Sequence, residues 1–389
     1  MTMGRRMENM KLRSRSSDES KDMFNPNRFA LARRRRGLKK TELAAGIGVS
    51  LKSIMKYESG DCPSPETMQR IVETLKFPDE FFFGDDLEEI DASAVSFRSM
   101  ARMPASRRDE ALGQGAMCVL LNQWLNERFG MPKSAIPNLQ LATPEAAAAI
   151  VRTEWGLGVQ PISNMIHLLE SKGVRVFSLS VKAREVDAFS MWKDETPFVM
   201  LNVQKSSEHS RFDAAHELGH LVLHRQGAPT GKEAESEANR FASGFLMPDA
   251  DVLANVVPNP TISALLKWKK RWKVSLAALN YRLHQLNMTT DYHYRQLCIA
   301  ISNMGARTSE VDGVPRETSL LMAKILKMLA DDGVSRARVA TDLSISSEEL
   351  DAMMFGLTMT ALPGGKPNRD VKPPNLRSSL SLVPSPSMK

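Results

Sequence analysis

The stretch AAHELGHLVLH at residues 214–224 carries three histidines at intervals of four, with Glu217 directly after the first of them. In an α-helix, residues four apart share a face, so His216 and His220 point the same way, one turn apart. Two imidazoles at this spacing are able to bind one Zn²⁺, and Glu217 beside them can accept a proton from a water that the metal activates. The pattern indicates a metal-dependent site for peptide hydrolysis, with an accidental polar helix face as the alternative.

A third protein ligand is needed for zinc. The position ten residues after the first histidine holds glutamine, and His224 lies two turns beyond it, roughly 12 Å along the axis, too far to share its ion. The next helical segment, GKEAESEANRFASGFLMP (231–248), offers Glu233 and Glu237 on one face, while Glu235 is expected to point elsewhere. One of the first two carboxylates is therefore expected to face the histidine pair, and the rest to be solvated.

Three short stretches before this helix are typical of strands: VRVFSLS (174–180), AFSMW (188–192) and PFVMLN (197–202). Helical patterns surround them, so the sequence predicts a mainly α fold with a small β-sheet, of the α+β class. The third stretch precedes the HExxH helix by a few residues and is expected to run beside the metal at a sheet edge. An extended peptide substrate could add there as another strand; an internal strand, paired on both sides, is the alternative.

The net charge of +7 is concentrated near the N-terminus, since residues 25–60 contain nine Lys or Arg and two Glu. Such a patch favours a polyanion partner. The three cysteines are far apart and suit free thiols in a reducing compartment. Because the chain also has neither a secretory signal pattern nor an apolar run of membrane-spanning length, we expect a cytoplasmic protein without membrane contact.

The basic block at residues 25–87 breaks into short amphipathic helices. Five apolar residues fall where two helices joined by a tight turn would meet, and two glycines supply the turn: Leu43, Ala44, Ile47, Val49 and Ile54, with Gly46 and Gly48. Ser50 then caps a helix that presents short polar and cationic side chains, which suits a DNA major groove. The candidate DNA-binding residues are Lys40, Ser50, Lys52, Ser53 and Lys56. A helical bundle with a solvated basic face is the alternative.

KKTELAAGIGVSLKSIMKYESGDCPSP (39–65) resembles the helix-turn-helix of phage-repressor-type (XRE-like) regulators. The resemblance implies that the partner is double-stranded DNA. Lys40 and Leu51 stand where such domains often carry a base-reading glutamine. Because Leu51 cannot hydrogen-bond a base edge, phosphate contacts are better supported than sequence readout.

Several motifs together resemble the ImmA/IrrE family of metallopeptidases: VDAFSMW (186–192), PFVMLN, RFDAAHELGHLVLH (211–224), EANRFASGFLMP (237–248) and RLHQLNM (282–288). The resemblance covers roughly residues 143–310 and implies a zincin-like fold. It also implies that His216 and His220 bind the metal, that Glu217 is the general base, and that Glu237 is the third ligand. Members of this family act inside cells and often cleave a repressor that has its own helix-turn-helix.

The C-terminal stretch 319–357 has an apolar helical period and a capping box from Ser346 to Glu349. We expect a packing module there, with a second helix-turn-helix as the weaker alternative. The sequence thus predicts six segments: a disordered arm (1–24), a helix-turn-helix domain (25–87), a linker and helix (88–142), a metallopeptidase-like domain (143–290), a C-terminal helical region (291–360) and a disordered tail (361–389).

The favoured function is a DNA-binding transcriptional regulator carrying a zinc-dependent metallopeptidase that cleaves a protein partner, such as a repressor, or its own linker. The main alternative is a transcription factor or antitoxin-like binder whose peptidase-like domain only senses a metal or ligand; a purely structural module is a third. Zn²⁺ suits the ligands, although the affinity order of divalent metals leaves Mn²⁺, Fe²⁺ and Co²⁺ open. The sequence does not decide whether the chain forms a homodimer.

Overall fold

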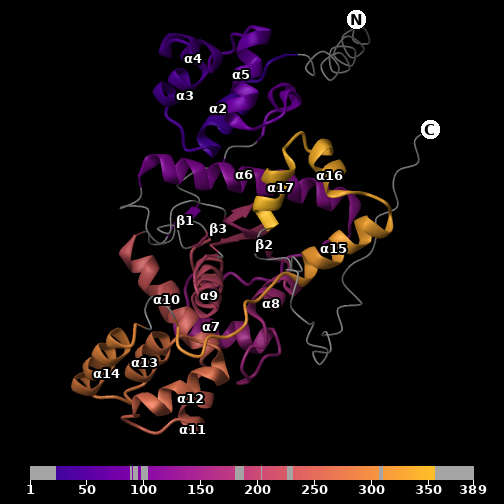
Figure 1. Cartoon of the computed structure of the whole chain (residues 1–389). Helices are drawn as coiled ribbons and strands as arrows, with labels where there is room; N and C mark the ends of the chain where they lie inside the picture. Colours follow the sequence, from indigo (N-terminus) through magenta and orange to yellow (C-terminus); the bar gives the residue numbers. More distant parts are fainter. Residues whose placement is uncertain are drawn as a thin grey trace, which may run out of the picture. The chain divides into compact units, whose positions relative to one another are not determined.

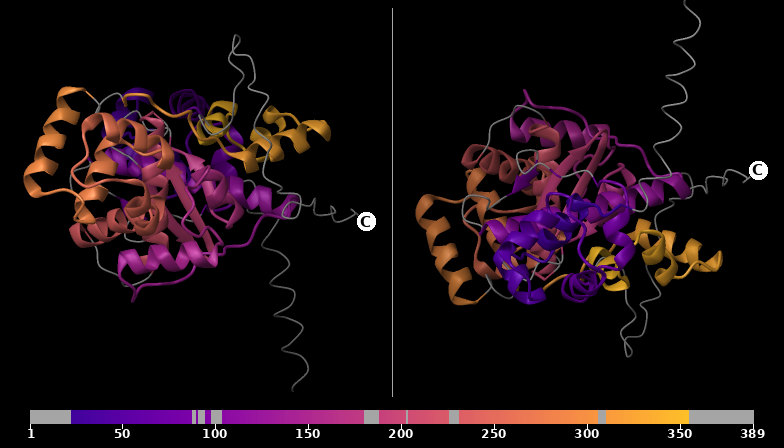
Figure 2. Two further views of the ribbon diagram at one scale, coloured as in Figure 1. Left: turned by 90° about the horizontal axis from the view of Figure 1, so that it is seen from below. Right: turned by 90° about the horizontal axis from the view of Figure 1, so that it is seen from above.

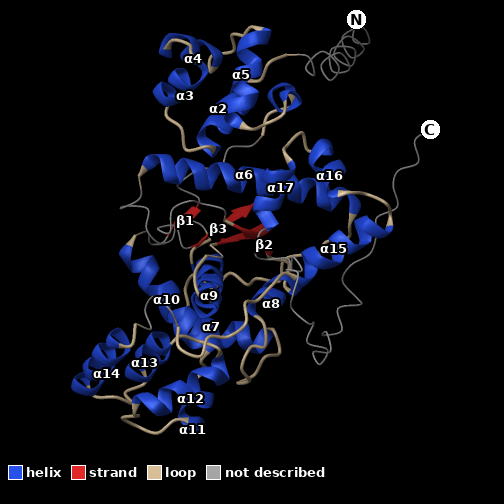
Figure 3. Ribbon diagram, viewed as in Figure 1, coloured by secondary structure: helices blue, strands red, loops and turns tan. Residues whose placement is uncertain are grey.

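The computed structural model describes residues 23–87, 90, 95–97, 104–179, 188–202, 204–225, 231–305 and 310–354. Helices make up most of these residues and the sheet is small, so the predicted fold class is confirmed (Figure 3). Contacts divide the chain into two compact units. Unit 1 comprises residues 1–90, 102–124 and 329–353, and unit 2 comprises residues 91–101, 125–328 and 354–389.

Several expectations concern residues outside this description. The expected tail at 361–389 and all of the expected arm except Met23 and Phe24 lie outside the described residues. Among the helices that are described, none is long and apolar enough to cross a bilayer.

Unit 1 begins with a compact group of short helices: α2 (Pro26–Arg35), α3 (Lys40–Ile47), α4 (Leu51–Tyr57), α5 (Pro65–Leu75) and the 3-10 helix η2 (Asp79–Phe83). Their apolar faces form a core that includes Phe29, Leu43, Ile47, Ile54 and Ile71, each no more than 1% exposed. The turn between α3 and α4 depends on one glycine only, because Gly48 has a φ of 66° whereas Gly46 lies within α3.

Helix α6 (Ala105–Arg128) starts within the segment that was expected to be a linker. Two of the polar residues that suggest a linker are buried in unit 1, since Glu110 is 6% exposed and Gln114 is fully buried. Gly113 permits a close approach, since a Cβ at this position would lie 3.0 Å from the Cα of Arg35 in α2. A glycine that is unfavourable for an isolated helix is therefore required by the packing of α6 against α2.

The C-terminal helices differ from the expected separate region. They are α15 (Leu320–Asp331), α16 (Arg336–Asp342) and α17 (Ser347–Met354), and residues 329–353 group with unit 1. Ser346 accepts the backbone N–H of Glu349 at 3.1 Å, as a capping box requires. The Glu349 carboxylate instead pairs with Arg35 Nε at 2.5 Å and Arg36 Nη1 at 2.9 Å. This buried ion pair joins α17 to α2, two helices at opposite ends of the sequence.

Unit 2 contains a four-stranded sheet of order β1-β3-β4-β2, formed by β1 (Val95–Phe97), β2 (Arg175–Ser178), β3 (Ala188–Lys193) and β4 (Thr196–Leu201) (Figure 1). The three expected strands are present. The fourth, β1, lies in the expected linker. Strand β4 pairs antiparallel with β3 and parallel with β2. The expectation of a substrate edge at PFVMLN is therefore wrong, because β4 is paired on both sides.

Helices cover this sheet and extend beyond it. Helix α8 (Met165–Ser171) contacts β2, and α9 (Ser207–Leu223) contacts both β3 and β4. Helices α7 (Pro144–Glu154) and α10 (Lys232–Leu246) pack against α9 and against each other. The following helices are α11 (Asp249–Asn255), α12 (Ile262–Trp272), α13 (Leu276–Gln285) and α14 (Asp291–Asn303), coloured from salmon to orange in Figure 2. Of these, α12, α13 and α14 contact one another. Ser206 caps the start of α9, because its hydroxyl accepts the backbone N–H of His209 at 3.2 Å.

Glu170 in α8 anchors the start of α15. Its carboxylate accepts the backbone N–H groups of Leu320 at 3.2 Å and Leu321 at 3.0 Å, together with the Ser319 hydroxyl. Burial raises the pKa of Glu170 to about 7, although these hydrogen bonds act in the opposite direction. A carboxyl that is buried to this degree favours its protonated form.

Replacing Glu170 with Gln is expected to flatten the pH dependence of stability. The pKa of this group is 4.5 in its ordinary state and about 7 in the folded chain, so the folded state binds more protons between these values. Stability contributed by this group is therefore lost as the pH rises through that window, by on the order of 3 kcal/mol. Urea unfolding at the two ends of this pH window, followed by tryptophan fluorescence, measures the free energy of unfolding. This free energy should fall less between the two pH values in Glu170→Gln than in the unmodified chain. Equal losses in both chains would contradict this expectation.

Candidate metal centre and DNA-binding surface

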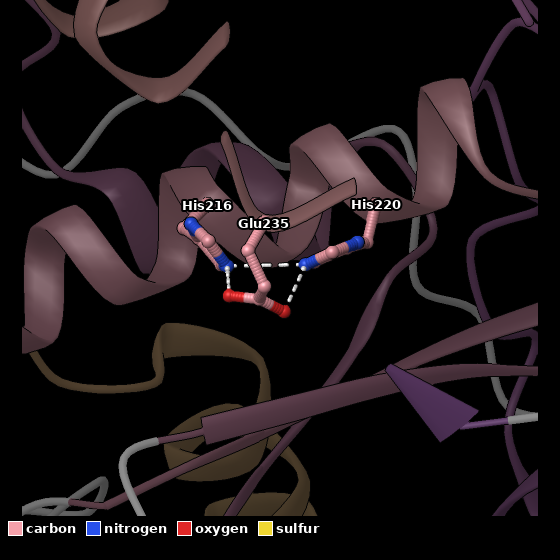
Figure 4. Close-up of side chains that lie close together, drawn as sticks. All are labelled: His216, His220 and Glu235. Carbon is pink, nitrogen blue, oxygen red and sulfur yellow. Dashed lines mark hydrogen bonds and ion pairs between the residues drawn. The ribbon is translucent and has the colours of Figure 1, made fainter. Parts of the chain in front are cut away.

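Helix α9 buries the three residues of its HExxH motif: His216 and Glu217 are each 1% exposed and His220 is 4% exposed. The two imidazoles turn their Nε2 atoms toward each other, 3.1 Å apart. The carboxylate of Glu235 in α10 faces both rings, with Oε2 3.3 Å from His216 Nε2 and Oε1 3.4 Å from His220 Nε2 (Figure 4). One ligand atom from each of the three residues lies within 4.8 Å of the others, as metal coordination requires.

The structure brings Glu235 to the histidine pair, and the expectation that this residue points elsewhere is wrong. Glu235 and Glu237 flank opposite sides of the apolar stripe by which α10 packs on α9. Gly219 permits this packing, because a Cβ there would lie 3.2 Å from the Cα of Ala238 and 3.1 Å from the Phe241 ring. Helical periodicity identifies the stripe, but only the crossing of the two helices determines which flank faces the histidines.

Glu237, the expected third ligand, contacts His224 instead. Its Oε2 lies 2.9 Å from His224 Nε2, and His224 Nδ1 lies 2.8 Å from His220 Nδ1. A consistent assignment has His220 Nδ1–H donate to His224, and His224 Nε2–H donate to Glu237. This relay leaves the Nε2 lone pair of His220 directed toward Glu235. His224 and Glu237 therefore orient the site and do not join the ligand cluster.

Asn239 performs the same task for the other imidazole, since its Oδ1 lies 3.1 Å from His216 Nδ1. An amide oxygen can only accept a hydrogen bond, so His216 carries its hydrogen on Nδ1 and directs its Nε2 lone pair into the cluster. This role of Asn239 was not predicted from the sequence. The signal was available, because Asn239 follows Glu235 by one helical turn and so shares its face.

The electrostatics of this cluster suit a cation. Burial lowers the pKa of His220 to about 4, and the neighbouring His216 acts in the same direction. Burial alone would raise the pKa of Glu235, but its close contacts with the His216 and His220 rings outweigh burial and lower this pKa to about 2. Two neutral imidazole lone pairs and a carboxylate thus converge, and Glu235 Oε2 is buried without a hydrogen-bond partner. These donors fit a divalent metal with nitrogen and oxygen ligands.

Glu217 points to the sheet, where Ser190 of β3 donates its hydroxyl to Glu217 Oε2 at 2.6 Å. Ser190 is 2% exposed, so this contact is shielded from solvent. No role for Ser190 was predicted from the sequence. Its position in the middle of a strand gave no local indication that it would meet the residue after His216. The hydroxyl thus holds the carboxylate of the residue that directly follows His216 in one orientation.

In unit 1, the expected DNA-contacting residues lie at the start of α3 and along α4. Ser50 caps α4 by accepting the backbone N–H of Ser53 at 3.1 Å. Lys52 and Lys56 are exposed on the same helix, whereas the Lys40 ammonium pairs with Glu58 at 2.5 Å. Helix α4 therefore presents two exposed cations, Lys52 in its first turn and Lys56 in its last turn, where the Lys56 ammonium lies 3.6 Å from Asp61.

Much of the basic run has an internal role. Arg28, Arg33 and Arg35 are 7%, 9% and 4% exposed. Arg28 Nε donates to the backbone carbonyl of Asp85 at 2.6 Å, and Arg33 Nε pairs with Glu58 at 2.7 Å. The charge available to phosphates is consequently smaller than the sequence count of this block suggests.

A helix-turn-helix in one unit and a His–His–Glu cluster on an HExxH helix in the other define a DNA-binding regulator with a metallopeptidase-like domain. Residues 30–82 match the helix-turn-helix family model, and residues 169–284 match that of the IrrE N-terminal-like domain. The chain thus joins an ImmA/IrrE-type domain to an N-terminal XRE-like helix-turn-helix, as the motifs predicted. No curated protein matches the chain.

Proposed function

We propose that this chain is a transcriptional regulator whose unit 2 is a zinc-dependent endopeptidase acting on a protein partner, such as a repressor. The observation that carries the proposal is the cluster of His216, His220 and Glu235 beside Glu217. These first three residues would hold the metal. The chemistry that a divalent cation supplies when bound is Lewis acidity, which polarises a scissile carbonyl and acidifies water.

The chain's own residues would perform the remaining tasks. Glu217 is buried and directly follows His216 in the sequence, and it would accept a proton from the attacking water and pass it to the leaving amine. Ser190 fixes the orientation of this carboxylate by its 2.6 Å hydrogen bond. Asn239 and His224 hold the imidazole rings so that both Nε2 atoms face Glu235. Such orienting contacts raise metal affinity, since the lone pairs need no reorganisation on binding.

Replacing Glu217 with Gln is expected to retain metal and lose hydrolysis. Gln keeps the shape of the side chain and an oxygen for Ser190, but it cannot act as a base, so hydrolysis should fall by about 10²–10⁴-fold. The measurement pairs elemental analysis with cleavage of an unfolded fluorescent casein by the zinc-loaded chain. His220→Ala is the matched variant, because it should lose both metal and hydrolysis.

The outcome also distinguishes the two main functions. Metal binding without hydrolysis in the unmodified chain would support the alternative in which the domain only senses a metal or ligand. Hydrolysis that persists in Glu217→Gln would overturn the assignment of the base.

In unit 1, we infer that α4 enters the major groove and that Lys52 and Lys56 contact phosphates. Leu51 and Met55 are 42% and 54% exposed on the same helix. Apolar side chains in this place suit contacts with thymine methyl groups. Phosphate contacts would then supply most of the affinity, and the two apolar residues a modest preference for thymine.

Replacing Lys52 and Lys56 with Ala is expected to weaken DNA binding and to lower the salt slope by about two, since each lysine neutralises one phosphate. Gel shifts over a range of salt concentrations provide the measurement. Lys232→Ala/Lys267→Ala is a matched control, because it removes the same charge from exposed positions of unit 2. A salt slope that is the same in both double variants would exclude this DNA-binding surface.

A further inference from the structure

Strand β1 covers the outer edge of β3. The two strands are antiparallel, with Val95 opposite Met191, Ser96 opposite Ser190, and Phe97 opposite Phe189. The other edge of β3 is paired with β4 along its whole length. Residues 95–97 come from the segment between the helix-turn-helix and α6, and they are grouped with unit 2. A piece of the chain outside the matched metallopeptidase-like segment thus completes its sheet.

This edge adjoins the proposed catalytic residues. Ser190, in the middle of the pairing with β1, donates its hydroxyl to Glu217. The backbone of β3 at this position is therefore only one serine side chain away from the proposed base. An unpaired strand edge binds extended polypeptides through main-chain hydrogen bonds. A peptide on the edge of β3 would run its backbone past the HExxH helix.

We propose that residues 95–97 are a built-in occupant of this peptide-binding edge, and that a protein substrate must displace them. This inference rests on the proposed peptidase function. The pairing extends over only three residues, and a single hydrogen bond contributes about 0.5–1.5 kcal/mol net. Because residues 95–97 are part of the same chain as β3, their effective concentration at this edge is in the millimolar range. A short pairing therefore suffices to compete with a protein substrate.

The occupant couples the substrate site to the linker. A longer extended segment of a partner makes more main-chain hydrogen bonds than a three-residue strand, and so replaces it. Substrate binding then releases residues 95–97 from the edge of β3. By linkage, any contact that holds residues 95–97 on β3 weakens substrate binding by the same factor.

The test uses a peptide as probe and requires no hydrolysis. In the Glu217→Gln chain, the double substitution Val95→Pro/Ser96→Pro removes the pairing of β1 with β3. Only every second residue of β1 donates its backbone N–H to β3, so one of the two prolines always removes such a donor. Val95→Ala/Ser96→Ala is the matched control that keeps both N–H groups. The probe is a fluorescein-labelled peptide with the sequence of residues 91–101, DASAVSFRSMA. Fluorescence polarisation should show it binding the proline variant at least about tenfold more tightly than the alanine variant.

Hydrogen exchange gives a second readout that stays valid if the domain proves not to be a peptidase. Without probe, the amides of residues 189–191 should exchange faster in the proline variant than in the alanine variant. In the chain that carries only Glu217→Gln, saturating probe should accelerate exchange of residues 95–97, and this measurement needs no change in β1. Equal probe affinities together with unchanged exchange would overturn the proposal. So would cleavage of the zinc-loaded unmodified chain between residues 91 and 101, because the segment would then be a substrate.

Discussion

Glu235→Gln is expected to abolish metal binding, whereas Glu237→Gln two positions away retains it. Glu235 faces both imidazoles, and its removal leaves two neutral nitrogens without a charged ligand. Structural sites bind Zn²⁺ with a free energy of roughly 10–16 kcal/mol, to which only a few ligands contribute. Loss of one ligand should therefore lower the affinity for the metal by about a thousandfold or more. Glu237 contacts only His224 among the histidines of this site, and loss of an orienting partner costs about 10–100-fold.

Each of these two variants serves as the control for the other, since both exchange a carboxylate for an amide on the same helix. Zinc content after dialysis and competition with a chromophoric chelator would rank the affinities. A larger loss in Glu237→Gln than in Glu235→Gln would restore Glu237 as the ligand and contradict the geometry of the cluster.

Glu349→Ala is expected to destabilise unit 1 by about 3–5 kcal/mol, because it leaves buried Arg35 without its counter-charge. The side chains of Arg35 and Glu349 are 4% and 2% exposed. Burial raises the pKa of Glu349, but the charges of Arg35 and Arg36 outweigh it and lower this pKa. The carboxylate is thus ionised in the folded chain, and its truncation removes an anion that two guanidinium groups require.

Chemical denaturation measures this loss, and Glu348→Ala is the matched control, since Glu348 precedes Glu349 on the same helix and is exposed. The control is expected to stay within about 0.5 kcal/mol of the unmodified chain. Hydrogen exchange should locate the effect in α2 as well as α17. Similar midpoints for both variants would mean that α17 does not stabilise the helix-turn-helix unit.

Local patterns in the sequence predicted the elements that depend on neighbouring residues. The spacing of His216 and His220 places both on one helix face wherever the helix lies, so two members of the cluster could be named at once. The helix-turn-helix followed in the same way from apolar spacing and from the cap at Ser50. Strands β2, β3 and β4 were recognisable because runs of β-branched and aromatic residues stand between polar turns.

Local patterns could not predict which segments, distant in the sequence, contact one another in the fold. Glu235 and Glu237 flank one apolar stripe, and the close crossing of α9 and α10 at Gly219 determines which of them meets the histidines. Strand β1 is too short to be recognised by its pattern, and its pairing depends on the edge that β3 offers. The Glu349 side chain was expected to complete a capping box, but it pairs with Arg35, which lies more than three hundred residues away in the sequence. The periodicity of apolar residues predicts which face of a helix or strand is buried. Which segment packs against that face depends on how the whole chain folds.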